Sequence, residues 1–417
     1  MSKAPDATSI AESAQALFCA IADYIGKDKT NKDFNLHKYP TYEDFWNNIS
    51  WTVYNKAVKR IETPGVTPTM IDDFLNTHEG WYKSSVLVAK KLVNDITDID
   101  PDLNIAAKGF QSLYYFRGDD DVMGNIEKLF KIANKKVPAL KGQITFGNVN
   151  KWSPADIYLA SKTAKKDIAT AVRNAKPGTF TFYNLNDLVS DLIDSGDLLP
   201  LSLKKTTKTV GLYKVNFDRA EELKTLSKLS IIKNNPTTDW KPYKKVAYGK
   251  KAETRDMRIW LNNDGEIKIR HDPSAARLVV EFIGSGAEAR AGSIGSVKVF
   301  CDLLKVINPT LAATTLSKYQ AGEKKYNAAI KTSRMVKLAQ ARSVGTAAQK
   351  KSAKNLYDFE RGAISAIYIV NNIMPGLKKF FRGKSDKNQE QINAFIRLMY
   401  GYLTSRSPLS GKFVIAK

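Results

Sequence analysis

The hydrophobic pattern of the chain changes twice along its length, from helical to β-prone and back to helical. This order limits the chain to folds that combine helices with a sheet. Apolar residues recur at helical spacing over residues 8–26, behind Thr8 as a candidate cap, and further helical patterns follow to about residue 135. From Ile144 to residue 283, short β-prone runs are bounded by Gly, Pro and Asn. Helical patterns then return. The succession predicts an α+β (mixed α/β) protein.

These sequence patterns predict three regions. They are a mainly helical N-terminal region (1–135), a central mixed or mostly antiparallel sheet with flanking helices (136–312), and a basic helical C-terminal region (313–417). Within the central region, the runs MRIWL, EIKIR and RLVVEFI alternate with the turn sequences NNDGE and HDPSA over 257–283, which predicts an antiparallel meander continuing the same sheet. The β-prone ending FVIA (413–416) is expected to add a strand to a sheet and tie the tail to the core.

Positive charge is concentrated in the second half of the chain. Lys and Arg number 24 against 25 Asp and Glu in residues 1–203, but 41 against 17 in residues 204–417. A folded segment with this excess attracts polyanions, and nucleic acid releases condensed counterions when Lys and Arg replace them. We therefore expect nucleic acid as the partner. A solubilising surface is the alternative explanation.

Composition also limits the kind of site the chain can build. Cys19 and Cys301 lie far apart and outside any C-x-x-C pattern, which predicts neither a disulfide framework nor a thiolate zinc site and suits a reducing compartment. The chain has three histidines, none at helical ligand spacing from another, so carboxylates are the expected ligands of any metal. No apolar run reaches the roughly 18 residues of a membrane span, and we expect a soluble, cytoplasmic protein without a membrane partner.

Two short segments carry the residues best suited to chemistry. The segment KWSPADIYLA (151–160) places Asp156 at the start of a β-prone run, and PLSLKK (200–205) places Ser202 and Lys204 on one face of another strand. If the two strands are adjacent, the three side chains meet. A strand-borne Asp beside a Lys can hold a divalent metal on oxygen ligands and neutralise charge on a phosphate. The alternative is an ordinary buried strand followed by an edge strand with solvated lysines.

This arrangement resembles the PD-(D/E)xK nuclease family over about residues 120–290, with PAD and SLK in the places of its two motif elements. The resemblance implies Mg²⁺ or Mn²⁺, with Asp156 as a metal ligand, Lys204 as the group that orients water or neutralises charge, and Glu127 as an extra metal-binding acid. The chain departs from the family at Ser202, where the family has its second acid. Either another acid, such as Glu281, takes that catalytic place, or the fold is retained without cleavage.

Several basic positions outside this motif are expected to contact nucleic acid. The loop GSGAEARAGSIG (284–295) has small residues that let backbone N–H groups approach a phosphate, although a flexible turn explains it equally simply. The aromatic and basic run KPYKKVAY (241–248) is similar to a single-strand binding surface. The triplet Asp119 to Asp121 is explained better as a helix cap than as a metal site. The residues predicted to bind nucleic acid are Lys205, Lys208, Arg290, Arg406 and Lys412.

Two functions from different classes remain open at this stage. The first is a metal-dependent nuclease that acts on DNA phosphodiesters, and the second is a non-catalytic nucleic-acid-binding or virion-associated structural protein, which Ser202 favours. A membrane-surface or acidic-protein partner for residues 314–354 is a third, weaker alternative. The segments KWSPADIY and SLKK, the glycine-rich loop and the C-terminal ending together also resemble sequences of uncharacterised proteins of large tailed bacteriophages. That resemblance implies action in a bacterial host cell or in a virion, with a homo-oligomer or virion assembly as partner.

Overall fold

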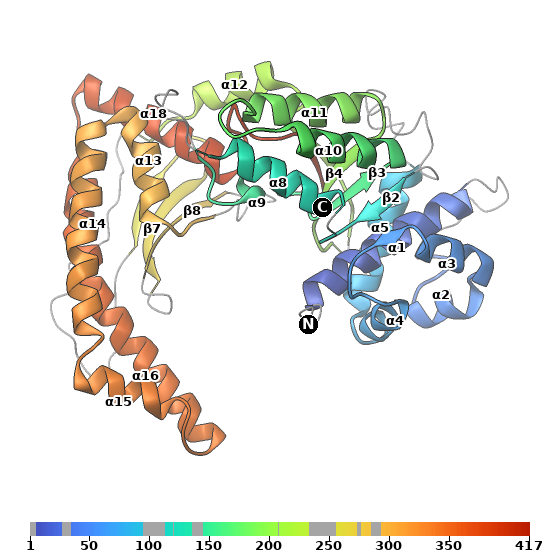
Figure 1. The fold of residues 1–417 in the computed structure, drawn as a ribbon, viewed down its shortest axis with the longest axis horizontal. Coiled ribbons are helices and arrows are strands. Elements are labelled where there is room, and N and C mark those ends of the chain that lie inside the picture. The colour runs from blue at the N-terminus through green and yellow to red at the C-terminus, as the bar shows by residue number, and fades with distance from the viewer. Residues whose placement is uncertain are drawn as a thin grey trace. The chain divides into compact units, whose positions relative to one another are not determined.

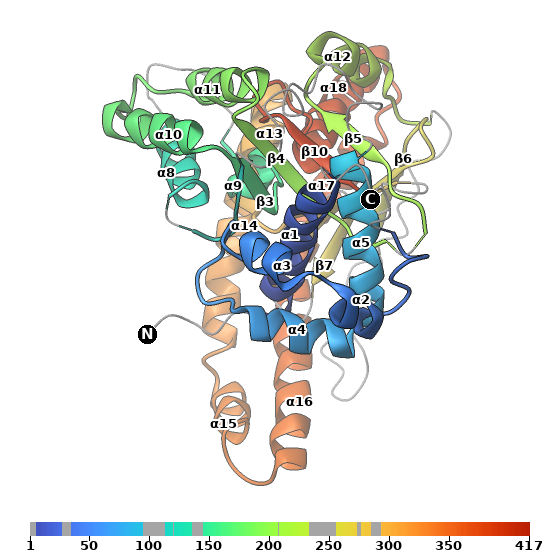
Figure 2. The same cartoon turned by 90° about the vertical axis from the view of Figure 1, so that its right-hand side faces the viewer.

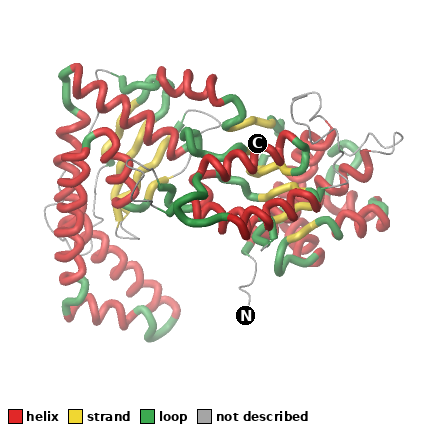
Figure 3. Tube along the Cα trace, turned by 45° about the horizontal axis from the view of Figure 1, so that its top comes forward, coloured by secondary structure: helices red, strands yellow, loops and turns green. Residues whose placement is uncertain are grey.

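The chain folds into two compact units, each with helices and strands, in agreement with the predicted α+β class (Figure 3). The computed structural model describes residues 6–26, 35–94, 113–119, 121–135, 145–206, 208–232, 256–272, 277–284 and 293–417. The first unit comprises Met1–Val137, Asn148–Arg219 and Leu409–Lys417, and the second comprises Pro138–Gly147 and Ala220–Pro408. These units differ from the three consecutive regions expected from sequence, because the chain crosses between them several times and its tail returns to the first unit.

A six-stranded mixed sheet forms the centre of the first unit, in the order β1-β2-β3-β4-β10-β5. β1 and β2 are parallel, β3 is antiparallel to both β2 and β4, and β10 runs parallel to β4 and antiparallel to β5. The tail strand β10 was predicted from FVIA and is confirmed. The strands are β1 (Ile61–Glu62), β2 (Tyr114–Phe116), β3 (Ile157–Ala160), β4 (Leu198–Leu203), β5 (Leu212–Val215) and β10 (Phe413–Ala416). β1 and β2 lie in the region expected to be mainly helical.

Helices cover both faces of this sheet (Figure 2). On one face, α1 (Ala7–Gly26) and α5 (Glu79–Asn94) pack against alternate strand residues such as Leu159, Leu201 and Val414 in one apolar core. Asp6, rather than the expected Thr8, caps α1 by accepting hydrogen bonds at 2.8 Å from the backbone N–H and hydroxyl of Ser9. On the other face lie α8 (Met123–Ala133), α10 (Lys162–Asn174) and α11 (Phe182–Asp194).

Short helices complete the first unit. They are α2 (Tyr42–Asn48), α3 (Trp51–Val58), α4 (Pro68–Thr77) and α9 (Val149–Trp152). α2 begins in a full capping box between Thr41 and Asp44, and the side chain of Thr67 caps α4, whose first residue is Pro68. These local signals fix where each helix begins.

The second unit contains a separate four-stranded antiparallel sheet, in the order β6-β7-β8-β9. Its strands are β6 (Met257–Trp260), β7 (Glu266–Asp272), β8 (Arg277–Ile283) and β9 (Ser293–Ile294), and a helix α12 (Arg219–Lys228) precedes them. The predicted meander is therefore confirmed. Its expected continuity with the central sheet was wrong, because β10 takes the place beside β4 and the meander strands pair among themselves.

The remaining helices of the second unit follow β9 (Figure 1). They are α13 (Val297–Ile307), α14 (Pro309–Ala329), α15 (Ser333–Ala341), α16 (Ala347–Ser365), the π-helical segment η3 (Ala366–Val370), α17 (Asn371–Phe381) and α18 (Asp386–Leu403). α14 approaches η3 so closely that a Cβ on Gly322 would overlap the carbonyl oxygen of Tyr368. None of the described helices is both long and apolar enough to cross a membrane.

Candidate functional site

Asp156, Ser202 and Lys204 meet at one end of the six-stranded sheet, as the sequence predicts for adjacent strands. Asp156 immediately precedes β3, which pairs with β4 and so brings Ser202 beside it. The Oδ2 atom of Asp156 accepts hydrogen bonds from the backbone N–H of Leu203 at 2.6 Å and from the Ser202 hydroxyl at 3.1 Å. The ammonium of Lys204 lies 2.8 Å from the Ser202 hydroxyl and 3.4 Å from Asp156 Oδ2.

A second acid, Glu12 of α1, lies within electrostatic range of Asp156 and Lys204 and forms an ion pair with Arg117, which follows β2. The guanidinium of Arg117 donates to Glu12 Oε2 at 2.6 Å, and the Glu12 side chain is 12% exposed. Burial and the negative charge of Asp156 raise the pKa of Glu12 to about 7, although the hydrogen bond from Arg117 opposes this shift. We call Glu12, Arg117, Asp156, Ser202 and Lys204 the strand-end cluster.

The loop that carries Lys204 is anchored to the helices of the same unit. The Ser84 hydroxyl oxygen of α5 accepts hydrogen bonds from the side-chain amide of Gln15 and from the backbone N–H of Thr206, both at 3.0 Å. The ammonium of Lys205 lies 5.4 Å from the ring centroid of Trp81. These contacts hold the segment after β4 in register with α1 and α5, so Lys204 and Glu12 are positioned by one set of elements.

The strand-end cluster is accessible to a solute and carries both signs of charge. The side chain of Asp156 is 26% exposed and that of Lys204 is 52% exposed. Two carboxylates and a nearby ammonium can hold a divalent cation and a phosphate together, because Mg²⁺ keeps several waters and binds one or two carboxylates plus substrate phosphates. A divalent cation held by these carboxylates would offset the burial and the charge of Asp156 that raise the pKa of Glu12. The donor set therefore fits Mg²⁺ or Mn²⁺, although the described residues contain no group of three His, Cys, Asp or Glu side chains able to hold a metal.

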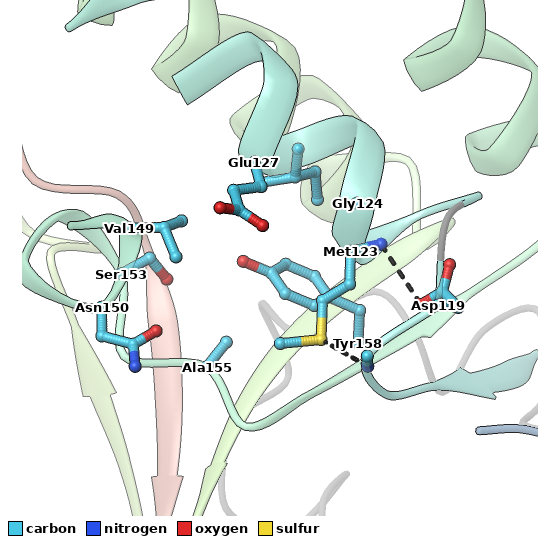
Figure 4. Close-up of a pocket in the computed structure, with 11 residues that line it drawn as sticks. Asp119, Met123, Gly124, Glu127, Val149, Asn150, Ser153, Ala155 and Tyr158 are labelled. Atoms are coloured by element: carbon cyan, nitrogen blue, oxygen red, sulfur yellow. Dashed lines mark hydrogen bonds between the residues drawn. The ribbon is translucent and has the colours of Figure 1, made fainter. Parts of the chain in front are cut away.

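Glu127 belongs to a different part of the first unit. Its side chain on α8 is 48% exposed and pairs with Lys131 at 2.8 Å. It lines a cavity of about 150 Å³ together with Asp119, Ser153 and Tyr158, and Asp156 is not among the lining residues (Figure 4). The contacts of the described residues therefore do not support joint metal binding by Glu127 and Asp156.

The acidic triplet before α8 contacts the first backbone N–H groups of this helix through Asp119. Its carboxylate accepts hydrogen bonds from the backbone N–H groups of Asp121 at 2.8 Å and Val122 at 2.5 Å. Asp121 pairs instead with Lys165 of α10 at 2.5 Å. The N-cap position of α8 is Val122, but Asp119 supports the start of the helix, because its carboxylate also accepts a hydrogen bond from the backbone N–H of Met123 at 3.3 Å.

Glu281 lies in the second unit, on β8. Both of its carboxylate oxygens accept hydrogen bonds from Arg270 on β7, at 2.9 Å each. Within the first unit, Glu12 is an acid whose pKa is raised by burial and by the charge of Asp156.

The other predicted nucleic-acid contacts lie at scattered positions. Lys208 is exposed in the loop after β4. The ammonium of Lys412 lies 3.9 Å from the carboxylate of Asp194 and 5.6 Å from the ring centroid of Phe217. The side chain is 20% exposed, so Lys412 already interacts with groups of the protein itself. Arg406 belongs to the second unit, where it donates to the Tyr400 hydroxyl at 3.4 Å. Arg290, with most of its glycine-rich loop, and the run 241–248 lie outside the described residues.

Comparisons of the chain with protein-family models, with curated proteins and with solved structures found no match. The strand-end cluster is therefore interpreted from its own geometry.

Sequence analysis missed Glu12 and Arg117. A usable signal existed for Glu12, because α1 contains only two charged residues, Glu12 and Asp23, among apolar and small ones. A charge in such a helix requires a partner. Asp23 finds Arg60 at 2.7 Å, and Glu12 finds Arg117. Which partner each acid takes depends on long-range packing and has no local signature.

Proposed function

We propose that this protein is a metal-dependent nuclease that acts on DNA phosphodiesters and that the strand-end cluster is its active site. The observation that carries the proposal is the contact of Asp156, Ser202 and Lys204 at the start of β3 and the end of β4, with Glu12 of α1 near enough for the charge of Asp156 to raise its pKa. Two acids and a lysine at an accessible sheet end suit phosphodiester hydrolysis, which needs charge stabilisation at the phosphate and an activated water.

Each residue of the strand-end cluster has a role in this proposal. Glu12 and Asp156 would hold Mg²⁺ or Mn²⁺, which when bound supplies Lewis acidity and an activated water. Lys204 neutralises charge that develops on the phosphate, and the Ser202 hydroxyl, 2.8 Å away, orients its ammonium. Arg117 fixes the Glu12 carboxylate by its 2.6 Å hydrogen bond.

A plasmid-nicking assay with Mg²⁺ or Mn²⁺ tests the catalytic assignment. We expect Glu12→Gln, Asp156→Asn and Lys204→Met each to reduce the cleavage rate by on the order of 100-fold. Matched controls are Glu43→Gln and Lys166→Met, exposed residues of α2 and α10. If the three site variants cleaved DNA at the parent rate, the strand-end cluster would not be the active site.

Metal binding can be measured without any cleavage. Mn²⁺ should raise the melting temperature of the parent protein, because a ligand that binds only the folded state stabilises it, and this rise should disappear in Asp156→Asn. An equal rise in the parent and in Asp156→Asn would place the metal elsewhere.

A second candidate function is nucleic-acid binding or a structural role in a virion, without cleavage. Ser202 favours it, because this position offers a hydroxyl already donated to Asp156 instead of a second strand-borne acid. DNA binding without metal-dependent nicking, and without stabilisation by Mn²⁺, would support this second function. For either function we propose action in the cytoplasm of a bacterial host or in a virion, with homo-oligomer or virion assembly, following the resemblance to phage proteins.

A further inference from the structure

The longest acid-free basic segment of the second unit spans residues 324–357. It contains nine Lys and Arg residues and no Asp or Glu. The segment covers the end of α14, all of α15 and the first half of α16. α15 and α16 contact each other and form a helical hairpin beyond the end of α14 (Figures 1 and 2). We call residues 330–357 the basic hairpin.

Arginine side chains stabilise the basic hairpin from within. Arg334 of α15 forms a two-pronged ion pair with the buried carboxylate of Glu360, with Nε 2.9 Å from Oε2 and Nη2 2.5 Å from Oε1. The guanidinium of Arg342 stacks 4.0 Å from the ring centroid of Tyr357. Met335 is buried at the contact between the helices. Both arginines of the basic hairpin are therefore committed to internal contacts.

Lysine side chains, in contrast, face solvent. Lys331, Lys337, Lys350, Lys351 and Lys354 are all exposed, and none of them forms an ion pair with a residue in the described part of the chain. Lys350 and Lys354 lie one helical turn apart on α16, and Lys351 is adjacent to Lys350. Residues 324–357 contain no acid to neutralise these lysines, so the exposed surface of the basic hairpin carries a net positive charge.

We propose that the basic hairpin binds the phosphate backbone of duplex DNA without reading its sequence. Lysine acts as a point charge that suits single phosphates, whereas the bidentate reading of guanine is mainly a task of arginine, and the arginines here are used internally. The exposed apolar residues of the basic hairpin are Val336 and Val344, 42% and 69% exposed, smaller than the residues that anchor helices in membranes. The inference rests on DNA as the partner in the proposed function, but not on cleavage.

Fluorescence anisotropy with a labelled 20-base-pair duplex tests this inference on the full chain. Asp156→Asn in every sample and EDTA in the buffer keep binding separate from cleavage. One variant carries Lys→Gln at positions 331, 337, 350, 351 and 354. The matched control carries the same charge change at five exposed lysines of the first unit, positions 56, 59, 90, 166 and 176.

We expect the hairpin variant to reduce the slope of log affinity against log salt by about four, since each phosphate contact contributes roughly 0.9. The control should keep the parent slope. The loss should be the same for duplexes of unrelated sequence. An equal loss in both variants, a strong dependence on sequence, or an unchanged DNA affinity with lost binding to phosphatidylserine vesicles would overturn the inference. Circular dichroism checks that the variant keeps the helix content of the parent.

Discussion

At the scale of single residues, the environment of Glu12 in the strand-end cluster disfavours its ionised form. Its pKa is raised from 4.5 to about 7, first by burial and then by the charge of Asp156. The folded state therefore holds a proton that the unfolded state releases, and the stabilising contribution present below pH 4.5 is lost as pH rises to 7. A site that costs stability at neutral pH is expected where function requires the charge.

Glu12→Gln should therefore flatten the pH dependence of stability. The parent should lose about 3 kcal/mol of its free energy of unfolding from this group between pH 4.5 and pH 8, and the variant should not. Urea denaturation at a series of pH values measures the difference, with Glu43→Gln as control. A parent and variant with parallel pH profiles would contradict the environment assigned to Glu12.

His271 should show the opposite dependence. It is 5% exposed on β7, its Nε2 lies 3.2 Å from the Ser365 hydroxyl, and burial lowers its pKa from 6.5 to about 4. The unfolded state binds the proton more readily, so stability falls as pH drops from 6.5 to 4, by about 3 kcal/mol. His271→Gln should remove that fall in urea titrations. Between pH 4.5 and 6.5, Glu12 and His271 change the free energy of unfolding in opposite directions, so the contribution of each must be measured in its own variant.

At the scale of elements, β10 joins β5 to the rest of the first sheet. It lies between β4 and β5, and Phe413 is buried in it. Phe413→Ala should reduce the free energy of unfolding by about 3–5 kcal/mol, because it removes a large buried ring from a strand that joins two others. Ile415→Val, at a half-buried position of the same strand, is the control and should cost less than about 1.5 kcal/mol in the same urea titration.

The close approach of α14 to η3 gives a second prediction at this scale. Gly322→Ala should destabilise the protein by about 1–3 kcal/mol, because its Cβ would meet the backbone at Tyr368 and force the two elements apart. Gly376→Ala in α17 is the matched control, since a Cβ there would meet only Leu311 Cδ1 at 3.9 Å. The control should be neutral or stabilising, because alanine favours a helix. Equal effects of both substitutions would argue against this contact.

At the scale of the whole molecule, the chain has two units with separate sheets. We expect calorimetry to resolve two unfolding transitions, because each unit has its own apolar core and its own hydrogen-bonded sheet. Phe413→Ala should lower the temperature of one transition and Gly322→Ala that of the other. A single transition lowered by both variants would mean that the two units unfold together.

The sequence by itself determined the local structure and part of the strand-end cluster. Helical and alternating patterns predicted the α+β class, the meander of 257–283 and the strand at 413–416, because these depend on periodicities within a few residues. The spacing of Ser202 and Lys204 on one strand likewise predicted that they would share a face with Asp156 nearby.

Only the tertiary structure decided which distant segments meet. Packing of α1 on the sheet brought Glu12 within electrostatic range of Asp156, and the pairing of β10 with β4 left the meander strands in a separate sheet. No local pattern could predict either, because a strand edge accepts any compatible strand and a helix face any complementary surface. The pairing that wins depends on the apolar surface buried by the whole chain.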